Sequence, residues 1–271
     1  MTNDAFQNTL ANDQRLIENA LQQLLPPTVF DQGEVVEAMR YSLMNGGKRL
    51  RPVLALEFCK ACGGDRHAVL EPACALEYVH TYSLIHDDLP CMDDDMMRRG
   101  KASTWAEYGE DIGVLTGDAL MMYAFETAAN AFETSIDPDE LSRIGRAMGI
   151  LARKTGVYGM IGGQTVDVEL AGGPIPGDKL EFIYRLKTGA LIEASMLIGA
   201  VLGGAAEEDC KIVESLAAKI GMAFQIQDDI LDVTGSQDVT GKPSGSDEKN
   251  KKTTYVTLEG LEKAKKDVEI L

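Results

Sequence analysis

The chain has too few basic residues for several common protein classes. It carries 26 lysine and arginine residues against 43 aspartate and glutamate residues, a formal net charge of -17. Proteins that bind the phosphate backbone of nucleic acids need a surplus of basic residues, so we expect no nucleic-acid partner. A small anionic ligand would need a local basic cluster or bridging metal ions.

Long apolar runs and a secretory signal are also absent from the sequence. No stretch of about 18 apolar residues occurs, the length that would suggest a membrane-spanning helix. The start, MTNDAFQNTL, has neither the basic nor the apolar region of a secretory signal. We therefore expect a cytoplasmic protein without stable membrane insertion.

Cysteine and histidine are scarce. The five cysteines are an odd number, which suits a reducing compartment. Cys59 and Cys62 form a CxxC pair, but there is no second such pair and the chain has only three histidines. Because a structural zinc site usually has four ligands, we interpret this pair as reduced thiols.

Helical periodicity dominates the sequence. Ile17, Ala20, Leu21 and Leu24 follow the spacing of one buried helix face, and long alternating strand patterns are missing. The pattern predicts an all-α protein. No linker or internal repeat divides it, so we expect one domain over residues 1–271. Helices are expected over residues 2–24, 32–45, 52–62, 68–89, 111–134, 138–171, 178–203, 207–234 and 255–271.

Local signals predict where some helices begin or break. Asp137 is expected to cap a helix that has Pro138 at its first position. Gly159 and the glycines that follow it are expected to bend or split the helix over 138–171. The polar, lysine-containing stretch 235–252 predicts a surface loop or a mobile basic lid.

An acidic cluster follows one apolar helix. Five carboxylates occur in the nine residues DDLPCMDDD at 87–95. A solvated acidic loop is one explanation. Another is a Mg²⁺ site, because this ion takes oxygen ligands from one or two carboxylates and from substrate phosphates. Pro90 is expected to interrupt the helix after Asp88, so that Asp93 can turn back toward Asp87.

A second acidic cluster lies in FQIQDDILD. Gln225, Asp228, Asp229 and Asp232 fall on one helix face in a helix that is otherwise mostly apolar. Such a stripe occurs on exposed amphipathic helices. Together with the first cluster, however, it would supply a two-sided metal clamp around a diphosphate.

Basic residues stand near these clusters. GGKRLRP reads as a helix stop, a short turn and a new helix with Pro52 at its first position. Arg51 would then sit at a helix N-terminus that favours anions, with Lys48 close by. An ordinary helix connection with solvated charges is the alternative. The arginine pair at 98–99 follows the acidic loop, and His80 shares a helix face with the first aspartate.

Taken in order, these motifs resemble those of the trans-isoprenyl diphosphate synthases. The matching segments are GGKRLRP, DDLPCMDDD followed by RRG, KTGAL at 187–191, and FQIQDDILD, and the similarity spans residues 46–255. The four-residue gap in DDxxxxD is most similar to the bacterial farnesyl diphosphate synthase branch. The resemblance implies the isoprenoid synthase fold, a single-domain helical bundle around a central active-site cavity.

The resemblance also implies roles for individual residues. The principal ligands of three Mg²⁺ ions would be Asp87, Asp93 and Asp228, with Asp88 and Asp232 in support. The diphosphate of isopentenyl diphosphate would be bound by Lys48, Arg51, His80 and Arg99. The allylic diphosphate would be held by Arg98, Lys187, Gln225, Lys242 and Lys252. Thr188 would help to position the allylic carbon, beside a supporting polar pair, Gln164 and Asp167. The implied catalytic residues are Asp87, Asp93, Arg98, Lys187 and Asp228.

The implied activity is that of a homodimeric farnesyl diphosphate synthase. Such an enzyme condenses isopentenyl diphosphate head-to-tail with dimethylallyl and then geranyl diphosphate and releases diphosphate. A geranylgeranyl diphosphate synthase would share every motif. A non-catalytic subunit of a prenyl synthase would be expected to lose one aspartate cluster, and both are intact.

Tyr82 and Ser83 are implied to set the product length. Tyr82 lies five residues before Asp87, roughly 7.5 Å along an ideal helix. Helix geometry turns it away from Asp87, so a tyrosine packed in the core is the alternative. In the resemblance, a large aromatic residue at this position accompanies farnesyl products.

Two departures from the family pattern stand out. Met96 and Met97 precede RRG where an acidic residue or leucine is usual. The chain ends at Leu271, so we expect the family's last C-terminal helix to be missing.

Overall fold

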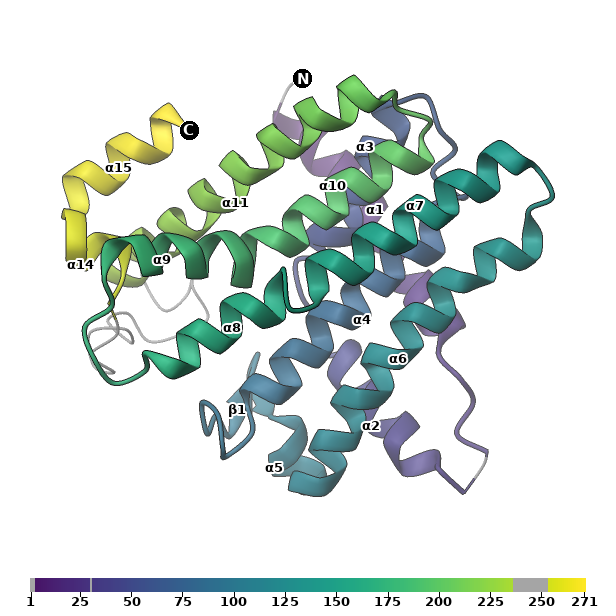
Figure 1. Ribbon diagram of the computed structural model, residues 1–271. Helices are drawn as coiled ribbons and strands as arrows, with labels where there is room; N and C mark the ends of the chain where they lie inside the picture. The colour runs from purple at the N-terminus through teal and green to yellow at the C-terminus, as the bar shows by residue number, and fades with distance from the viewer. Residues whose placement is uncertain (1–2, 30, 236–252) are drawn as a thin grey trace. The chain divides into compact units, whose positions relative to one another are not determined.

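The computed structural model describes residues 3–29, 31–235 and 253–271 (Figure 1). The chain divides into two compact units. Unit 1 contains Met1–Leu151 and Ser195–Cys210, and unit 2 contains Ala152–Ala194 and Lys211–Leu271. Apart from one short hairpin, the described residues form helices and connecting loops. The all-α prediction is confirmed, while the single-domain interpretation and its central cavity stay predictions.

Unit 1 is built mainly from the first half of the chain. Its helices are α1 (Asn3–Leu24), α2 (Gly33–Leu43), α3 (Leu50–Ala61), α4 (Leu70–Asp87), α5 (Thr104–Tyr108) and α6 (Glu110–Thr134). Its hairpin pairs β1 (Met97–Arg98) with β2 (Lys101–Ala102). Residues of both units occur in α7 (Pro138–Thr155), α10 (Ala190–Leu202) and α11 (Glu207–Thr234).

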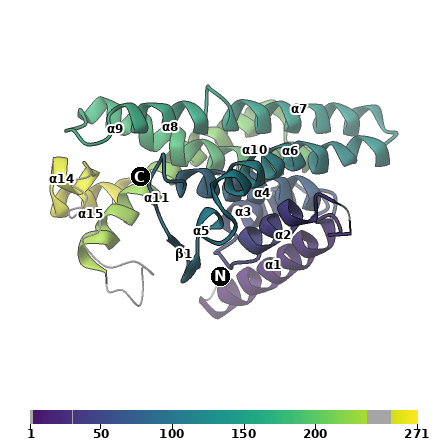
Figure 2. The same ribbon diagram turned by 90° about the horizontal axis from the view of Figure 1, so that it is seen from below.

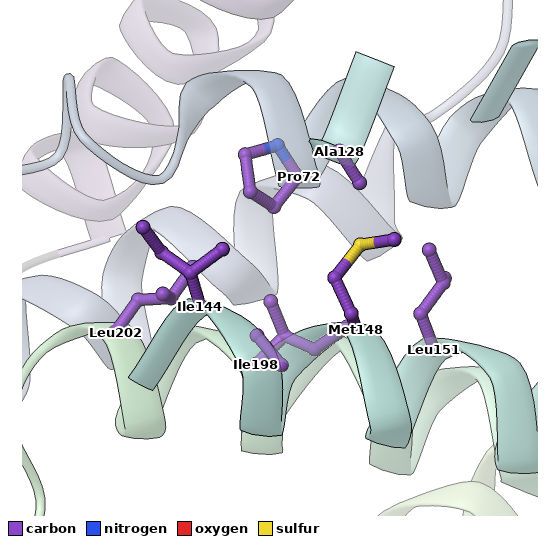
Figure 3. Close-up of a pocket in the computed structure, with 8 residues that line it drawn as sticks. Pro72, Ala128, Ile144, Met148, Leu151, Ile198 and Leu202 are labelled. Carbon is purple, nitrogen blue, oxygen red and sulfur yellow. The ribbon is translucent and has the colours of Figure 1, made fainter. Parts of the chain in front are cut away.

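Helix α4 is the centre of unit 1. It packs along α6 (Figure 1), and α1 packs against α3 and α4 (Figure 2). Eleven of its residues are buried, so α4 is enclosed by its neighbours rather than amphipathic. Further along the unit, Pro72 of α4 and Ala128 of α6 face Met148 of α7 and Ile198 of α10 around a small apolar cavity (Figure 3). The apolar core holds α4 in place, and α4 carries the first aspartates at its end.

Unit 2 contains the remaining elements. They are α8 (Met160–Glu169), α9 (Gly177–Ile183), the π-helix η1 (Tyr184–Gly189), α14 (Tyr255–Glu259) and α15 (Leu261–Ile270). Helices α8 and α9 both contact η1. Ile183 and Tyr184 belong to one buried apolar cluster of this unit, and Ile226 and Ile230 of α11 to another.

Several predicted helix boundaries are confirmed. The Asp137 carboxylate accepts a hydrogen bond of 3.0 Å from the backbone N–H of Asp139, as a cap should. The expected split near Gly159 occurs, because α7 ends at Thr155 and α8 begins at Met160.

Other boundaries were wrong. The helix predicted over 178–203 is interrupted by η1, and the one predicted over 255–271 is divided at Gly260. The sequence also gave no indication of α5 or of the hairpin. Each of these depends on packing and backbone geometry that hydrophobic periodicity does not encode. Within the described residues, no helix is long and apolar enough to cross a membrane.

Candidate active site

The first aspartate motif forms a tight turn at the end of α4. The helix ends at Asp87, and the backbone N–H of Asp93 donates a hydrogen bond of 2.9 Å to the Asp87 carbonyl. The N–H of Asp95 donates to the Asp88 carbonyl at 3.1 Å. The predicted helix stop and return of Asp93 toward Asp87 are therefore confirmed. Pro90, three residues beyond the last helical residue, cannot continue the helix, which explains the stop.

Asp88 differs from its neighbours in this turn. It is 2% exposed, and its carboxylate accepts two hydrogen bonds of 3.0 Å from Nε of Arg98. Burial raises the pKa of the Asp88 carboxyl, and Arg98 opposes that rise. Asp87 is half-buried and Asp93 is exposed. The structure thus gives Asp88 an arginine partner, and its supporting role at a metal stays a prediction.

The RRG motif is the turn of the hairpin. Arg99 and Gly100 have φ angles of 52° and 79°, and two successive positive φ angles are typical of tight hairpin turns. The Arg99 guanidinium donates to the carbonyl of Gly46, and Nδ2 of Asn45 donates to the carbonyl of Arg98 at 2.9 Å. The hairpin therefore fastens the aspartate turn to GGKRLRP. The preceding methionines are exposed and do not prevent it from forming.

Three residues predicted to bind isopentenyl diphosphate interact electrostatically in unit 1. Burial lowers the pKa of Arg51 to about 10, with Glu77 acting to raise it and Arg99 to lower it further. Burial also lowers the pKa of His80 well below its usual value, and Arg51 and Arg99 lower it further. Lys48, the fourth predicted residue, is exposed. The cluster is a cationic site enriched in hydrogen-bond donors.

In unit 2 the π-helix presents the KTG motif. Nζ of Lys187 donates to Oδ2 of Asp167 at 2.6 Å, and Oγ1 of Thr188 donates to Oε1 of Gln225 at 2.8 Å. Residues predicted from three separate motifs are thus brought together. A π-helical turn shifts side chains out of the α-helical register and is frequent at functional sites.

The two adjacent aspartates of the second motif lie in different environments. Asp228 is exposed, whereas Asp229 is 3% exposed and accepts hydrogen bonds from the Tyr184 hydroxyl and from the backbone N–H of Tyr255. Asp232 is half-buried. The predicted polar stripe therefore contains one buried structural carboxylate between more accessible ones.

Comparison with known proteins identifies the family. The polyprenyl synthetase family model matches residues 32–271. The chain belongs to the polyprenyl synthetase family. This places it among the trans-prenyltransferases.

Three curated relatives illustrate the similarity. The large subunit 1 of the heterodimeric chloroplastic geranylgeranyl pyrophosphate synthase of Arabidopsis thaliana is 43% identical over 98% of this chain and 71% of its own length. The farnesyl diphosphate synthase of Geobacillus stearothermophilus is 41% identical over 94% of this chain and 85% of its own length. The chloroplastic geranylgeranyl pyrophosphate synthase of Capsicum annuum is 47% identical over 84% of this chain, which spans only 61% of that relative.

Two solved structures share the fold. The FPP/GFPP synthase of Zymomonas mobilis matches with a TM-score of 0.83 and 34% identity over 97% of this chain and 89% of that one. The geranyltransferase of Helicobacter pylori, solved with magnesium and isoprenyl diphosphate, matches with a TM-score of 0.79 and 32% identity over 97% of this chain and 87% of that one. The fold is the all-α isoprenoid synthase fold of this family.

The family's metal fits the donor chemistry of the aspartate turn. Asp87 and Asp93 offer only oxygen donors, and their backbone hydrogen bond brings the two residues together. In the part of the chain that the structure describes, no three acidic, histidine or cysteine side chains form a ready-made metal site. Mg²⁺ does not need one, since it usually retains waters and takes ligands from substrate phosphates.

Tyr82 lies in the core of unit 1. It is 5% exposed, and its hydroxyl has no hydrogen-bond partner among the described residues. Its ring lies edge-on to His86, with centroids 5.9 Å apart, and burial raises its pKa to about 12. The hydroxyl of Ser83 instead bonds back to the His80 carbonyl at 2.8 Å.

Three further predicted residues are Lys242, Lys252 and Gln164. Lys242 and Lys252 lie outside the described residues. Gln164 is half-buried on α8, the helix that carries Asp167. Four buried side chains that hold the motifs in place by hydrogen bonds were not predicted from the sequence: Arg49, Glu77, Tyr184 and Asp229. Arg49 and Asp229 stand inside recognised motifs, which was a usable signal, whereas nothing local marks Glu77 or Tyr184.

Proposed function

We propose that the protein is a Mg²⁺-dependent farnesyl diphosphate synthase. It would condense isopentenyl diphosphate with dimethylallyl diphosphate and then with geranyl diphosphate, releasing one diphosphate each time. The observation that carries this proposal is the hairpin, which bonds to the aspartate turn through Arg98 and Asp88, and to Gly46 of the GGKRLRP turn through Arg99. The β1–β2 hairpin thereby supports both the acidic aspartate turn and the basic GGKRLRP turn.

In this proposal the two kinds of site handle different diphosphates. Asp87, Asp93 and Asp228 would hold Mg²⁺, which neutralises the charge that develops on the departing allylic diphosphate. Lys187 would orient the allylic diphosphate, and Asp167 would fix the Lys187 ammonium group in place. Arg51 and His80 would hold isopentenyl diphosphate.

The proposed reaction needs no protein nucleophile. The allylic C–O bond breaks, and its electron pair leaves with the diphosphate. The double bond of isopentenyl diphosphate then forms the new C–C bond with the allylic cation. A proton leaves the condensed product, and the departed diphosphate is its acceptor. The protein contributes positioning and electrostatic stabilisation.

The product length is the finer part of the proposal. Tyr82 supports a fifteen-carbon product, because a buried aromatic ring on α4, five residues before Asp87, would block a longer chain. The similarity to geranylgeranyl synthases supports the rival, a twenty-carbon product. Similarity to the large subunit of a heterodimeric synthase supports a second alternative, in which this chain has a different subunit as its partner.

Incubation with isopentenyl and dimethylallyl diphosphates and Mg²⁺, followed by chromatography of the dephosphorylated products, tests these readings. Mainly fifteen-carbon product supports the proposal, and mainly twenty-carbon product favours the rival. No product despite diphosphate binding would indicate a non-catalytic subunit. As a control, Asp87→Ala should lower turnover by several orders of magnitude while far-ultraviolet circular dichroism stays unchanged.

We also propose that the chain forms a homodimer through α6. Apolar side chains on one face of this helix are exposed: Val114 at 42%, Leu115 at 52% and Met122 at 64%. Phe132, 39% exposed and about five helical turns beyond Val114, lies on the same face, and the exposed Asp118 lies between Val114 and Met122. Several exposed apolar side chains on one helix face are unusual for a monomer, and a second copy of the chain would cover them.

Analytical ultracentrifugation tests the dimer. The wild type should sediment as a dimer, and Met122→Glu should shift it toward monomer. Val29→Glu is the matched control, because Val29 is 77% exposed and lies outside α6. A monomeric wild type would contradict the proposal.

A further inference from the structure

Arg49 is a buried arginine in a strained backbone position. It is 2% exposed and has a φ of 49°, in the left-handed region that residues other than glycine rarely adopt. Among the described residues, only Asp94 and Arg99 share this property, and each lies in a turn of a recognised motif. Such strain persists only where the surroundings fix the backbone, and it is frequent at functional sites.

The guanidinium of Arg49 shows what fixes this backbone. Nη1 donates to Oε1 of Glu77 and Nη2 donates to the carbonyl of Leu43, both at 2.8 Å. Glu77 is 2% exposed, so this ion pair is sealed from solvent. Arg49 therefore joins the end of α2 and the start of α3 to the middle of α4.

Glu77 has a second set of neighbours. It lies three residues before His80 on α4, a spacing that puts both side chains on one helix face. The Glu77 carboxylate also attracts the guanidinium groups of Arg51 and Arg99. Arg51 is repelled by Arg99, and Arg99 is repelled by Arg49 and Arg98. Glu77 is thus the carboxylate that allows several cationic groups to sit close together in a region of low dielectric constant.

The turn held by this pair is also hydrogen-bonded on two sides. On one side, the Arg99 guanidinium donates to the Gly46 carbonyl. On its other side, Nε2 of Gln14 donates to the carbonyl of Lys48 at 2.9 Å. A shift of Arg49 would therefore displace the whole turn.

From this geometry we infer that the Arg49–Glu77 ion pair is a positioning device that holds Lys48 and Arg51 in register with His80 and Arg99 for one diphosphate. Neither member of the pair contacts the ligand. The inference rests on the proposed function, in which this diphosphate belongs to isopentenyl diphosphate. It predicts that the pair governs affinity for that substrate while leaving the allylic substrate nearly unaffected.

The decisive variant replaces both partners, Arg49→Met with Glu77→Leu. Apolar replacement of a whole buried ion pair usually preserves stability, whereas removal of one partner leaves a buried charge uncompensated. Calorimetric titration with isopentenyl diphosphate should show affinity weakened on the order of ten- to hundredfold, the scale expected when binding groups are misplaced by about 1 Å. The Michaelis constant for geranyl diphosphate should change less than about twofold.

A second ion pair of unit 1, in which one member is buried, supplies the control. Asp13 is 1% exposed and pairs with Arg66, whose side chain is 29% exposed. Asp13→Leu with Arg66→Met should leave the affinity for isopentenyl diphosphate unchanged. Arg49→Lys adds an independent measurement, because it keeps the charge but loses the two-pronged donor that spans Glu77 and Leu43, and affinity should again fall.

The outcomes separate this inference from the proposed function. A folded double variant, or a folded Arg49→Lys, with wild-type affinity for isopentenyl diphosphate would overturn the inference alone. A wild type that does not bind isopentenyl diphosphate would overturn the proposed function and the inference with it. Equal losses of affinity in the Asp13 and Arg66 double variant would also count against the inference, since they would mean that removal of any ion pair from unit 1 has the same effect.

Discussion

The Tyr184 hydroxyl donates a hydrogen bond of 2.5 Å to Oδ2 of Asp229, which links the first residue of the π-helix to α11. The same oxygen accepts the backbone N–H of Tyr255 at 2.8 Å, and Oδ1 accepts from Nε2 of Gln225 at 3.2 Å. Both oxygens of Asp229 thus hold unit 2 together, whereas the preceding Asp228 is exposed. Adjacent aspartates of one motif therefore have different physical tasks.

Replacing each aspartate in turn should separate these tasks. Asp228→Asn should raise the Mg²⁺ concentration for half-maximal activity on the order of ten- to hundredfold, because a ligand is lost. Asp229→Asn should lower turnover with little change in that concentration, and Tyr184→Phe should do the same more weakly. A Mg²⁺ titration of activity measures the difference. Equal Mg²⁺ dependence in the two asparagine variants would contradict the division.

Arg51→Ala should distinguish the two substrates. Its guanidinium belongs to the cationic cluster of unit 1, next to His80 and Arg99. The Michaelis constant for isopentenyl diphosphate should therefore rise far more than that for the allylic substrate, by about tenfold or more. Steady-state kinetics with each substrate varied in turn provide the measurement. Matching increases would mean that the basic residues are divided incorrectly.

Tyr82→Ala should lengthen the product. Removing the buried ring would open space on α4 below Asp87, so the main product should shift from fifteen carbons to twenty or more. Chromatography of the dephosphorylated products detects the shift. Ser83→Ala, at the other position implied to set the length, removes only one oxygen atom and should lengthen the product less than Tyr82→Ala. A Tyr82 variant that still stops at fifteen carbons would refute the assignment.

Gly163→Ala should disturb the π-helix. A Cβ atom added at Gly163 would lie 2.3 Å from the backbone nitrogen of Lys187, so α8 or η1 must move. We expect a loss of about 1–3 kcal/mol in the free energy of unfolding and weaker allylic binding. Gly145→Ala is the matched control, because nothing lies within 4 Å of the added atom in α7. Its free energy of unfolding should be unchanged or rise by up to about 1 kcal/mol.

His80 should make stability dependent on pH. Burial and the nearby Arg51, Arg99, Arg98 and Arg49 keep its pKa well below the usual value. Below about pH 6.5, the unfolded chain therefore takes up a proton that the folded protein does not, and the free energy of unfolding falls as pH decreases. His80→Gln should remove that part of the dependence in urea denaturation between about pH 5 and 7.5. An unchanged slope would contradict this prediction.

The sequence by itself determined the features that depend on near neighbours in the chain. Periodicity indicated the long helices, and Pro90 indicated where α4 stops and the aspartates turn back. Asp137 marked the start of α7. These features follow from local sterics, capping and the burial of one helix face, which a few consecutive residues decide. The order of the charged motifs was likewise sufficient to indicate the family.

Only the tertiary structure decided which partners the charged residues of each motif have and which of them are exposed. The motif GGKRLRP contains two arginines of equal appearance, yet Arg49 pairs with Glu77, 28 positions away, while Arg51 joins the cationic cluster. Asp229 binds the backbone of Tyr255, 26 positions away, while Asp228 is exposed. The partners that the fold supplies distinguish the two arginines and the two aspartates, because a charge removed from water must find a partner wherever the fold brings one. No local pattern encodes that distance.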